Sequence, residues 1–96
     1  MDDLQEQSSA LSSRDRRLLR TILSGRSDAN IRFAELRRLL HSMGFDERVR
    51  GSHHIFTIEG IRRPLSIQPL NSIVKPYQVR QFRAFVIQNG LVPHDS

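Results

Sequence analysis

The chain has 96 residues, enough for one hydrophobic core of modest size and too few for two ordinary domains. Lysine and arginine number 15 against 10 acidic residues, and the net charge of +5 indicates an anionic partner such as nucleic acid. No cysteine is present, which excludes a disulfide framework, a thiolate nucleophile and a thiolate metal site. No apolar run approaches the roughly 20 residues that span a bilayer, so we expect a cytoplasmic protein without a membrane partner.

The positive charge is unevenly distributed. Residues 1–30 hold five arginines and five acidic residues, so the whole excess lies in residues 31–96. All the basic residues except Lys75 are arginines, whose planar guanidinium group matches two phosphate oxygens at once. A basic ribonucleoprotein component or a membrane-surface protein would share this composition, so charge alone does not choose among them.

The N-terminal part is predicted to contain one helix. Residues 1–11 are polar and acidic, and we expect a flexible arm there. Residues 12–30 form an N-terminal helix and linker, with the helix over 13–24 between a serine N-cap and Gly25. Its apolar positions at helical spacing are Leu18, Leu19, Ile22 and Leu23.

A helix and three strands follow. Apolar residues at helical spacing predict a helix over 33–43, after a polar linker that ends at Arg32. Alternating patterns predict strands over 45–50, 53–58 and 62–68, separated by turns at Gly51-Ser52 and Glu59-Gly60. Pro64 removes a backbone donor and so places the third strand at a sheet edge.

The last element is a helix that begins at Pro76 after a loop over 69–74. It ends at Asn89-Gly90, where Leu91 can make the hydrophobic contact of a Schellman ending, and residues 93–96 form a tail. The fold class is therefore α+β: a two-layer α-β-β-β-α domain over 31–92 with both helices on one sheet face and an additional N-terminal helix.

The most informative segment is Gly-Ser-His-His-Ile-Phe at the turn before the second strand. Residues of a strand alternate between its two faces, so if Phe56 faces the core, His54 shares that side and His53 points away from it. Small residues beside an exposed imidazole leave room for a phosphate backbone, and imidazole titrates near working pH. This arrangement suits RNA chemistry.

Three segments together resemble the HicA family of toxins, which are small mRNA interferases. They are the helix Glu35-Leu36-Arg37-Arg38-Leu39-Leu40 ending in Met43-Gly44-Phe45, the run Gly51-Ser52-His53-His54-Ile55-Phe56, and the terminal Val86-Ile87-Gln88-Asn89-Gly90-Leu91. The resemblance covers about two-thirds of the chain. The N-terminal helix lies outside the compact family core, and the third strand lacks the valine-rich run of many members.

The resemblance implies a fold similar to double-stranded-RNA-binding domains, cleavage of mRNA, and inhibition by a HicB-like antitoxin. It also implies that the histidine linked to cleavage is His53, which agrees with the parity of the strand. We expect no cofactor and no metal in the reaction. The residues expected to contact RNA are Arg48, Arg50, Gly51, Ser52, Arg62, Arg63 and Lys75.

Other readings of these residues stay open. His54 is expected to be a packed histidine bonded to backbone, and His41 a residue of the helix surface. A two-histidine metal site is disfavoured because adjacent strand residues project to opposite faces. A nucleophilic role for Ser52 lacks an oriented base. The principal rival function is a non-catalytic RNA-binding or protein-interaction domain of the same fold, in which His53 only contacts a base.

Overall fold

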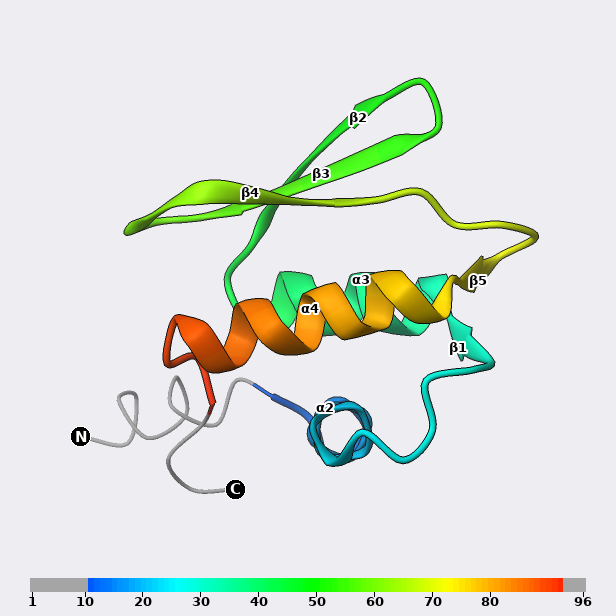
Figure 1. The fold of residues 1–96 in the computed structure, drawn as a ribbon. Helices are drawn as coiled ribbons and strands as arrows, with labels where there is room; N and C mark the ends of the chain where they lie inside the picture. The colour runs from blue at the N-terminus through cyan, green and yellow to red at the C-terminus, as the bar shows by residue number, and fades with distance from the viewer. Residues whose placement is uncertain (1–10, 93–96) are drawn as a thin grey trace.

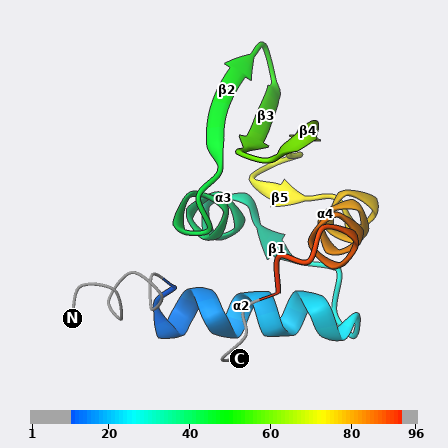
Figure 2. The ribbon, with the colours of Figure 1, turned by 90° about the vertical axis from the view of Figure 1, so that its left-hand side faces the viewer.

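The computed structural model describes residues 11–92, which build three stacked layers. A three-stranded antiparallel sheet of order β2-β3-β4 lies over two helices, α3 and α4, and a further helix, α2, crosses beneath them (Figure 1, Figure 2). The α+β class and the α-β-β-β-α order are confirmed. The elements are α2 (Ser13–Ser24), β1 (Ile31–Arg32), α3 (Phe33–Ser42), β2 (Asp46–Arg50), β3 (His53–Ile58), β4 (Ile61–Ile67), β5 (Ile73–Val74) and α4 (Pro76–Gln88).

The ends of the helices follow from local chemistry. The Ser12 hydroxyl accepts a hydrogen bond from the Asp15 backbone N–H at 3.0 Å, and Gly25 ends α2 with a φ of +73°, as the sequence predicts. After α4, the Leu91 N–H donates to the Val86 carbonyl at 2.9 Å, which is the predicted Schellman ending. No helix of residues 11–92 is long and apolar enough to cross a membrane.

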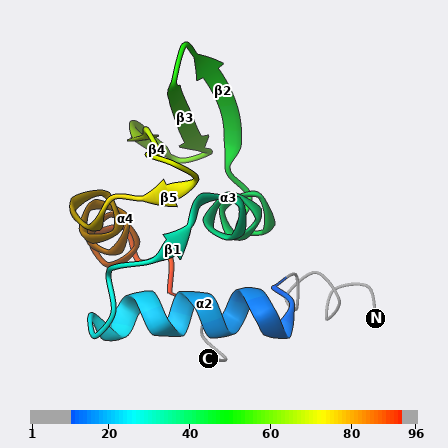
Figure 3. The ribbon, with the colours of Figure 1, turned by 90° about the vertical axis from the view of Figure 1, so that its right-hand side faces the viewer.

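Two short strands were not predicted. β1 and β5 pair antiparallel, with Ile31 opposite Val74, where the sequence indicated only a linker and a loop. A strand of two residues is too short to show a periodic pattern, so only its distant partner reveals it. The pairing holds the start of α3 beside the start of α4 (Figure 3).

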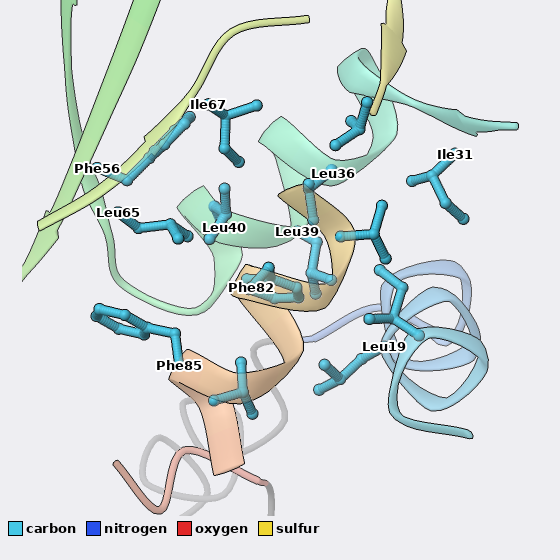
Figure 4. Packing of buried hydrophobic residues seen from close by; sticks show 14 of the residues in the cluster. Leu19, Ile31, Leu36, Leu39, Leu40, Phe56, Leu65, Ile67, Phe82 and Phe85 are labelled. Atoms are coloured by element: carbon cyan, nitrogen blue, oxygen red, sulfur yellow. The ribbon is translucent and has the colours of Figure 1, made fainter. Parts of the chain in front are cut away.

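The hydrophobic core lies between the sheet and the helices and continues to α2. Phe56 and Ile67 of the sheet are fully buried over α3 and α4, and Leu19 extends the same cluster from α2 (Figure 4). The buried hydrophobic residues are Leu19, Ile22, Ile31, Leu36, Leu39, Leu40, Phe45, Phe56, Leu65, Ile67, Val74, Val79, Phe82, Phe85 and Val86. The predicted helical stripes therefore all face one core.

Polar contacts also bind α2 to the two helices above it. Asp15 is buried at 3 % exposure, and its carboxylate accepts hydrogen bonds from Ser42 at 3.0 Å and Arg38 at 3.5 Å. Arg83 of α4 donates to the Ile22 carbonyl and also pairs with Asp28 (2.9 and 3.2 Å), which lowers the Asp28 pKa. The N-terminal helix is thus part of the packed structure.

The third strand of the sheet is an edge strand, as Pro64 predicts. Ile58 pairs with Ile61 and Phe56 with Leu65, so β4 accommodates extra residues against β3 between these two pairs. The predicted arm, apart from Leu11, and the predicted tail with His94 lie outside the described residues.

Replacing Leu19 by alanine tests the burial of α2. Leu19 is 1 % exposed, and a Leu→Ala change at a buried site lowers the free energy of unfolding by about 2–5 kcal/mol. Urea unfolding followed by circular dichroism measures this loss. The matched control is Arg20→Ala, an exposed neighbour in the same helix, which should change stability by less than about 0.5 kcal/mol. Equal losses in the two variants would contradict the packing of α2 into the core.

Candidate nucleic-acid interface at the β2–β3 hairpin

A two-residue turn joins β2 and β3. Gly51 occupies its first central position with a φ of +59°, a conformation that a residue with a side chain adopts only with strain. No atom lies within 4 Å of where a Cβ of Gly51 would sit, so backbone conformation and not crowding favours glycine here. Gly51 and Ser52 are both exposed, which leaves this end of the hairpin open to a ligand.

The outer face of the hairpin, turned away from the helices, is basic. Arg50 pairs with His53 and Arg48 with Ile55, and directly opposed residues of an antiparallel pair lie on the same face. Arg48, Arg50 and His53 are all exposed. The predicted strand with one basic face is confirmed, as is the orientation of His53 away from the core.

The inner face of the hairpin carries a cluster centred on Glu47, whose side chain is 5 % exposed. Its Oε1 accepts hydrogen bonds from Arg37 Nε at 2.6 Å and His41 Nε2 at 2.7 Å, both from α3. Its Oε2 accepts from His54 Nδ1 at 2.7 Å, across the strand pair. One carboxylate therefore links two strands of the hairpin to a helix.

These partners stabilise the ionised form of Glu47. Burial by itself raises the pKa of this carboxyl, but the hydrogen bonds from His54, His41 and Arg37 outweigh that effect. The pKa falls from its ordinary value of 4.5 to about 2. Glu47 is thus an anion in the folded protein at every physiological pH.

His54 is held by this carboxylate and by an aromatic ring. A carboxylate only accepts hydrogen bonds, so Nδ1 of His54 carries the proton that it shares with Glu47. The His54 ring lies 4.5 Å from the Phe33 ring, centroid to centroid. The predicted packing of His54 is confirmed. The predicted backbone partner is wrong, because the ring donates its hydrogen bond to the carboxylate of Glu47 on the neighbouring strand.

The other predicted RNA contacts lie away from His53. Arg62 and Arg63 follow the β3–β4 turn, which lies at the opposite end of β3 from the hairpin turn, so they do not join Arg48 and Arg50. Lys75 is the N-cap residue of α4, outside the three-stranded sheet, with its Nζ 6.0 Å from the centre of the Tyr77 ring. The structure therefore places the predicted contacts in three separate regions.

Sequence reasoning did not identify the Glu47 cluster. The strand pattern puts Glu47 on the same side as Phe45 and Val49, and a carboxylate on a core-facing side needs a partner. His54 lies on the same core-facing side of the next strand, and this shared side was the sequence feature that could have indicated their contact. The contributions of Arg37 and His41 depend on how α3 packs against the hairpin, and no strand pattern contains that information.

Comparison with protein families agrees with the resemblance to the HicA toxins that the sequence indicates. The family described as the HicA toxin of bacterial toxin–antitoxin systems matches residues 33–91. The chain belongs to the HicA family. Comparisons with curated proteins and with solved structures give no match.

The matched HicA segment begins at Phe33, the first residue of α3, and ends at Leu91, which closes α4. It contains His53, the Glu47 cluster and all the predicted RNA contacts. It leaves out α2, which agrees with the expectation that the N-terminal helix lies outside the family core. In this HicA protein, α2 nevertheless contributes Leu19 and Ile22 to the core.

A pH titration of stability tests the Glu47 cluster. Because the pKa of Glu47 is lower in the folded state, its ionisation stabilises the fold above about pH 4.5, and this contribution is lost as pH falls toward about 2. The contribution is at most about 3 kcal/mol. Urea unfolding at several pH values should show the wild type far more stable than Glu47→Gln at neutral pH and nearly equal to it near pH 2.

The control for this titration is Glu59→Gln, in the exposed turn between β3 and β4. Its difference from the wild type should stay small at every pH. A Glu47→Gln protein whose stability follows that of the wild type across the whole range would contradict the role of the cluster.

Proposed function

We propose that this HicA protein is an endoribonuclease that cleaves mRNA with the help of His53 and without a metal ion. The observation that carries the proposal is the place of His53: exposed, next to an open glycine turn, and opposite Arg50 in the last pair of the hairpin. Membership in a family of toxins from toxin–antitoxin systems supports a growth-inhibiting activity. Since the substrate is mRNA, the proposed place of action is the cytoplasm.

The proposed chemistry is transesterification by the RNA itself. A neutral His53 imidazole takes the proton of a ribose 2′-hydroxyl while that oxygen attacks the adjacent phosphorus. The bond to the 5′-oxygen of the next nucleotide breaks, which leaves a 2′,3′-cyclic phosphate, and the departing 5′-oxygen takes a proton from water. The guanidinium groups of Arg50 and Arg48 lie on the same face and favour the negative charge that develops on the phosphate oxygens. The chain's contribution is therefore proton transfer and charge stabilisation.

RNA binding is proposed to start from the same face. Arg48 and Arg50 provide the cations next to His53, and the exposed turn of Gly51 and Ser52 allows the phosphate backbone to come close. More distant parts of the RNA are proposed to contact two further sites. One is Lys75, the N-cap residue of α4, and the other is the pair Arg62 and Arg63 after the β3–β4 turn.

The proposed protein partner is a HicB-like antitoxin. The family to which this chain belongs consists of toxins from toxin–antitoxin systems. An antitoxin that covers His53 would prevent cleavage. The net charge of +5 favours a partner with an acidic surface, which would also accelerate association at low salt.

Cleavage of labelled mRNA in excess EDTA tests the catalytic role of His53. Relative to the wild type, His53→Ala should cut about 100 to 10,000 times more slowly, the usual contribution of a general acid–base group. His53→Gln retains a polar side chain of similar reach but cannot transfer the proton, so it should be equally impaired. The control is Gln81→Ala, an exposed change on α4 that should leave the rate unchanged.

Cleavage that survives in His53→Gln but not in His53→Ala would show that His53 only contacts the RNA. Binding without cleavage by the wild type would favour the non-catalytic RNA-binding function instead. Circular dichroism of each variant confirms that loss of activity is not loss of folding.

Two arginine variants test where the RNA lies. Arg50→Ala removes a cation directly opposite His53, whereas Arg62→Ala removes one near the far turn. We expect Arg50→Ala to reduce both the cleavage rate and the slope of log affinity against log salt, the latter by about one. Arg62→Ala should reduce the slope alone. Impaired cleavage in Arg62→Ala with a normal rate in Arg50→Ala would place the reaction at the other end of the sheet.

A further inference from the structure

A depression of about 390 Å³ lies along the hairpin and is not used by the proton transfer proposed above. It runs beside β2, away from the hairpin turn, and begins at Arg50, the residue paired with His53. The residues that line it are Asp46, Glu47, Arg48, Arg50, Ile55 and Thr57. All of these except Glu47 belong to the outer face, so the depression opens on the same side as His53.

The two ends of this depression differ in charge. Arg50 and Arg48 lie toward the turn, and Asp46 lies at the other end. Asp46 is exposed and has no ion pair or hydrogen bond from its side chain within residues 11–92, whereas the carboxylates of Asp15 and Glu47 are each held by several donors. Its two oxygens are thus available to a ligand.

The middle of the depression is less polar. Ile55, half-buried on the central strand, presents an apolar surface between the charged ends, and Thr57 faces Asp46 across the strand pair. Asp46 and Arg50 are four positions apart along an extended strand, a length of about 13 Å at the usual rise per residue. A nucleotide laid along the strand would bring its phosphate to the arginines, its base over Ile55 and the edge of the base to Asp46.

We propose that this depression is a subsite for one nucleotide of single-stranded RNA and that Asp46 selects guanine there. This inference rests on the proposed ribonuclease function, and it names the substrate class of the same site. The edge of a base is free to meet a side chain only when it is unpaired, so duplex RNA would not occupy the subsite.

The preference for guanine follows from hydrogen-bond chemistry. A carboxylate is an acceptor with two oxygens, and the Watson–Crick edge of guanine offers two parallel donors, N1–H and the N2 amino group. Adenine and cytosine each offer one amino donor next to an acceptor nitrogen, and uracil offers one N–H between two carbonyls. Only guanine matches both oxygens of Asp46 without bringing an acceptor against them.

Binding of short labelled RNA tests the subsite separately from cleavage. The probes are fluorescein-labelled hexauridylates in which the third base is guanine or adenine, titrated by fluorescence anisotropy into the full chain carrying His53→Ala to prevent cleavage. We expect the guanine probe to bind about tenfold more tightly, since a bidentate contact to a base discriminates by about that order. Adding Asp46→Asn should reduce the affinity for the guanine probe to that for the adenine probe.

The matched control is Glu59→Gln, which removes a different exposed carboxylate, in the turn between β3 and β4, and should keep the preference for guanine. Equal affinities for the two probes, absence of binding to both, or a preference that survives Asp46→Asn would each overturn the subsite. Cutting of the probes by the His53→Ala protein as fast as by the wild type would contradict the proposed catalytic role instead. A preference that disappears with Asp46→Asn would still support the subsite in that case, so the two failures are distinguishable.

Discussion

The two-residue turn at Gly51 and Ser52 is the constraint on which the rest of the site depends. It fixes the register of β2 against β3, and in an antiparallel pair the register decides which residues share a face. A slip of one residue would turn His53 toward the helices and expose Phe56, a cost that the hydrophobic core does not permit. The positive φ of Gly51 and the burial of Phe56 therefore act together to present His53 and Arg50 on one open face.

The Glu47 cluster fixes the hairpin on its other side. Toward its tip the hairpin rises away from α3 and α4, so hydrophobic contact with the helices ends before the turn (Figure 1, Figure 2). Val49 is accordingly 55 % exposed although it belongs to the inner face. Hydrogen bonds donated to Glu47 by Arg37, His41 and His54 add a polar connection between the hairpin and α3, beside the buried Phe56 that pairs with Glu47. The inner face of the hairpin thus contributes to stability, and the outer face carries the residues of the proposed chemistry.

The helix α2 contributes to the core and not to the hairpin. It lies outside the segment matched by the HicA family, on the far side of α3 and α4 from the sheet (Figure 2, Figure 3). Its buried leucine and isoleucine, and the contacts of Asp15 and Arg83, give the two helices a second packed surface. Because this surface is opposite the hairpin, α2 adds to the core without obstructing the face that carries His53.

The sequence by itself determined the helices, the three main strands and the outward orientation of His53. These features depend on local information: helix caps, a glycine at each turn, and apolar spacing of 3.6 or 2 residues. Partners distant in the sequence decided the rest. The pairing of β1 with β5, the separation of Arg62 from Arg50, and the convergence of His41, Arg37 and His54 on Glu47 all follow from how the elements pack, and a periodic pattern shows only which side a residue faces, not what meets it there.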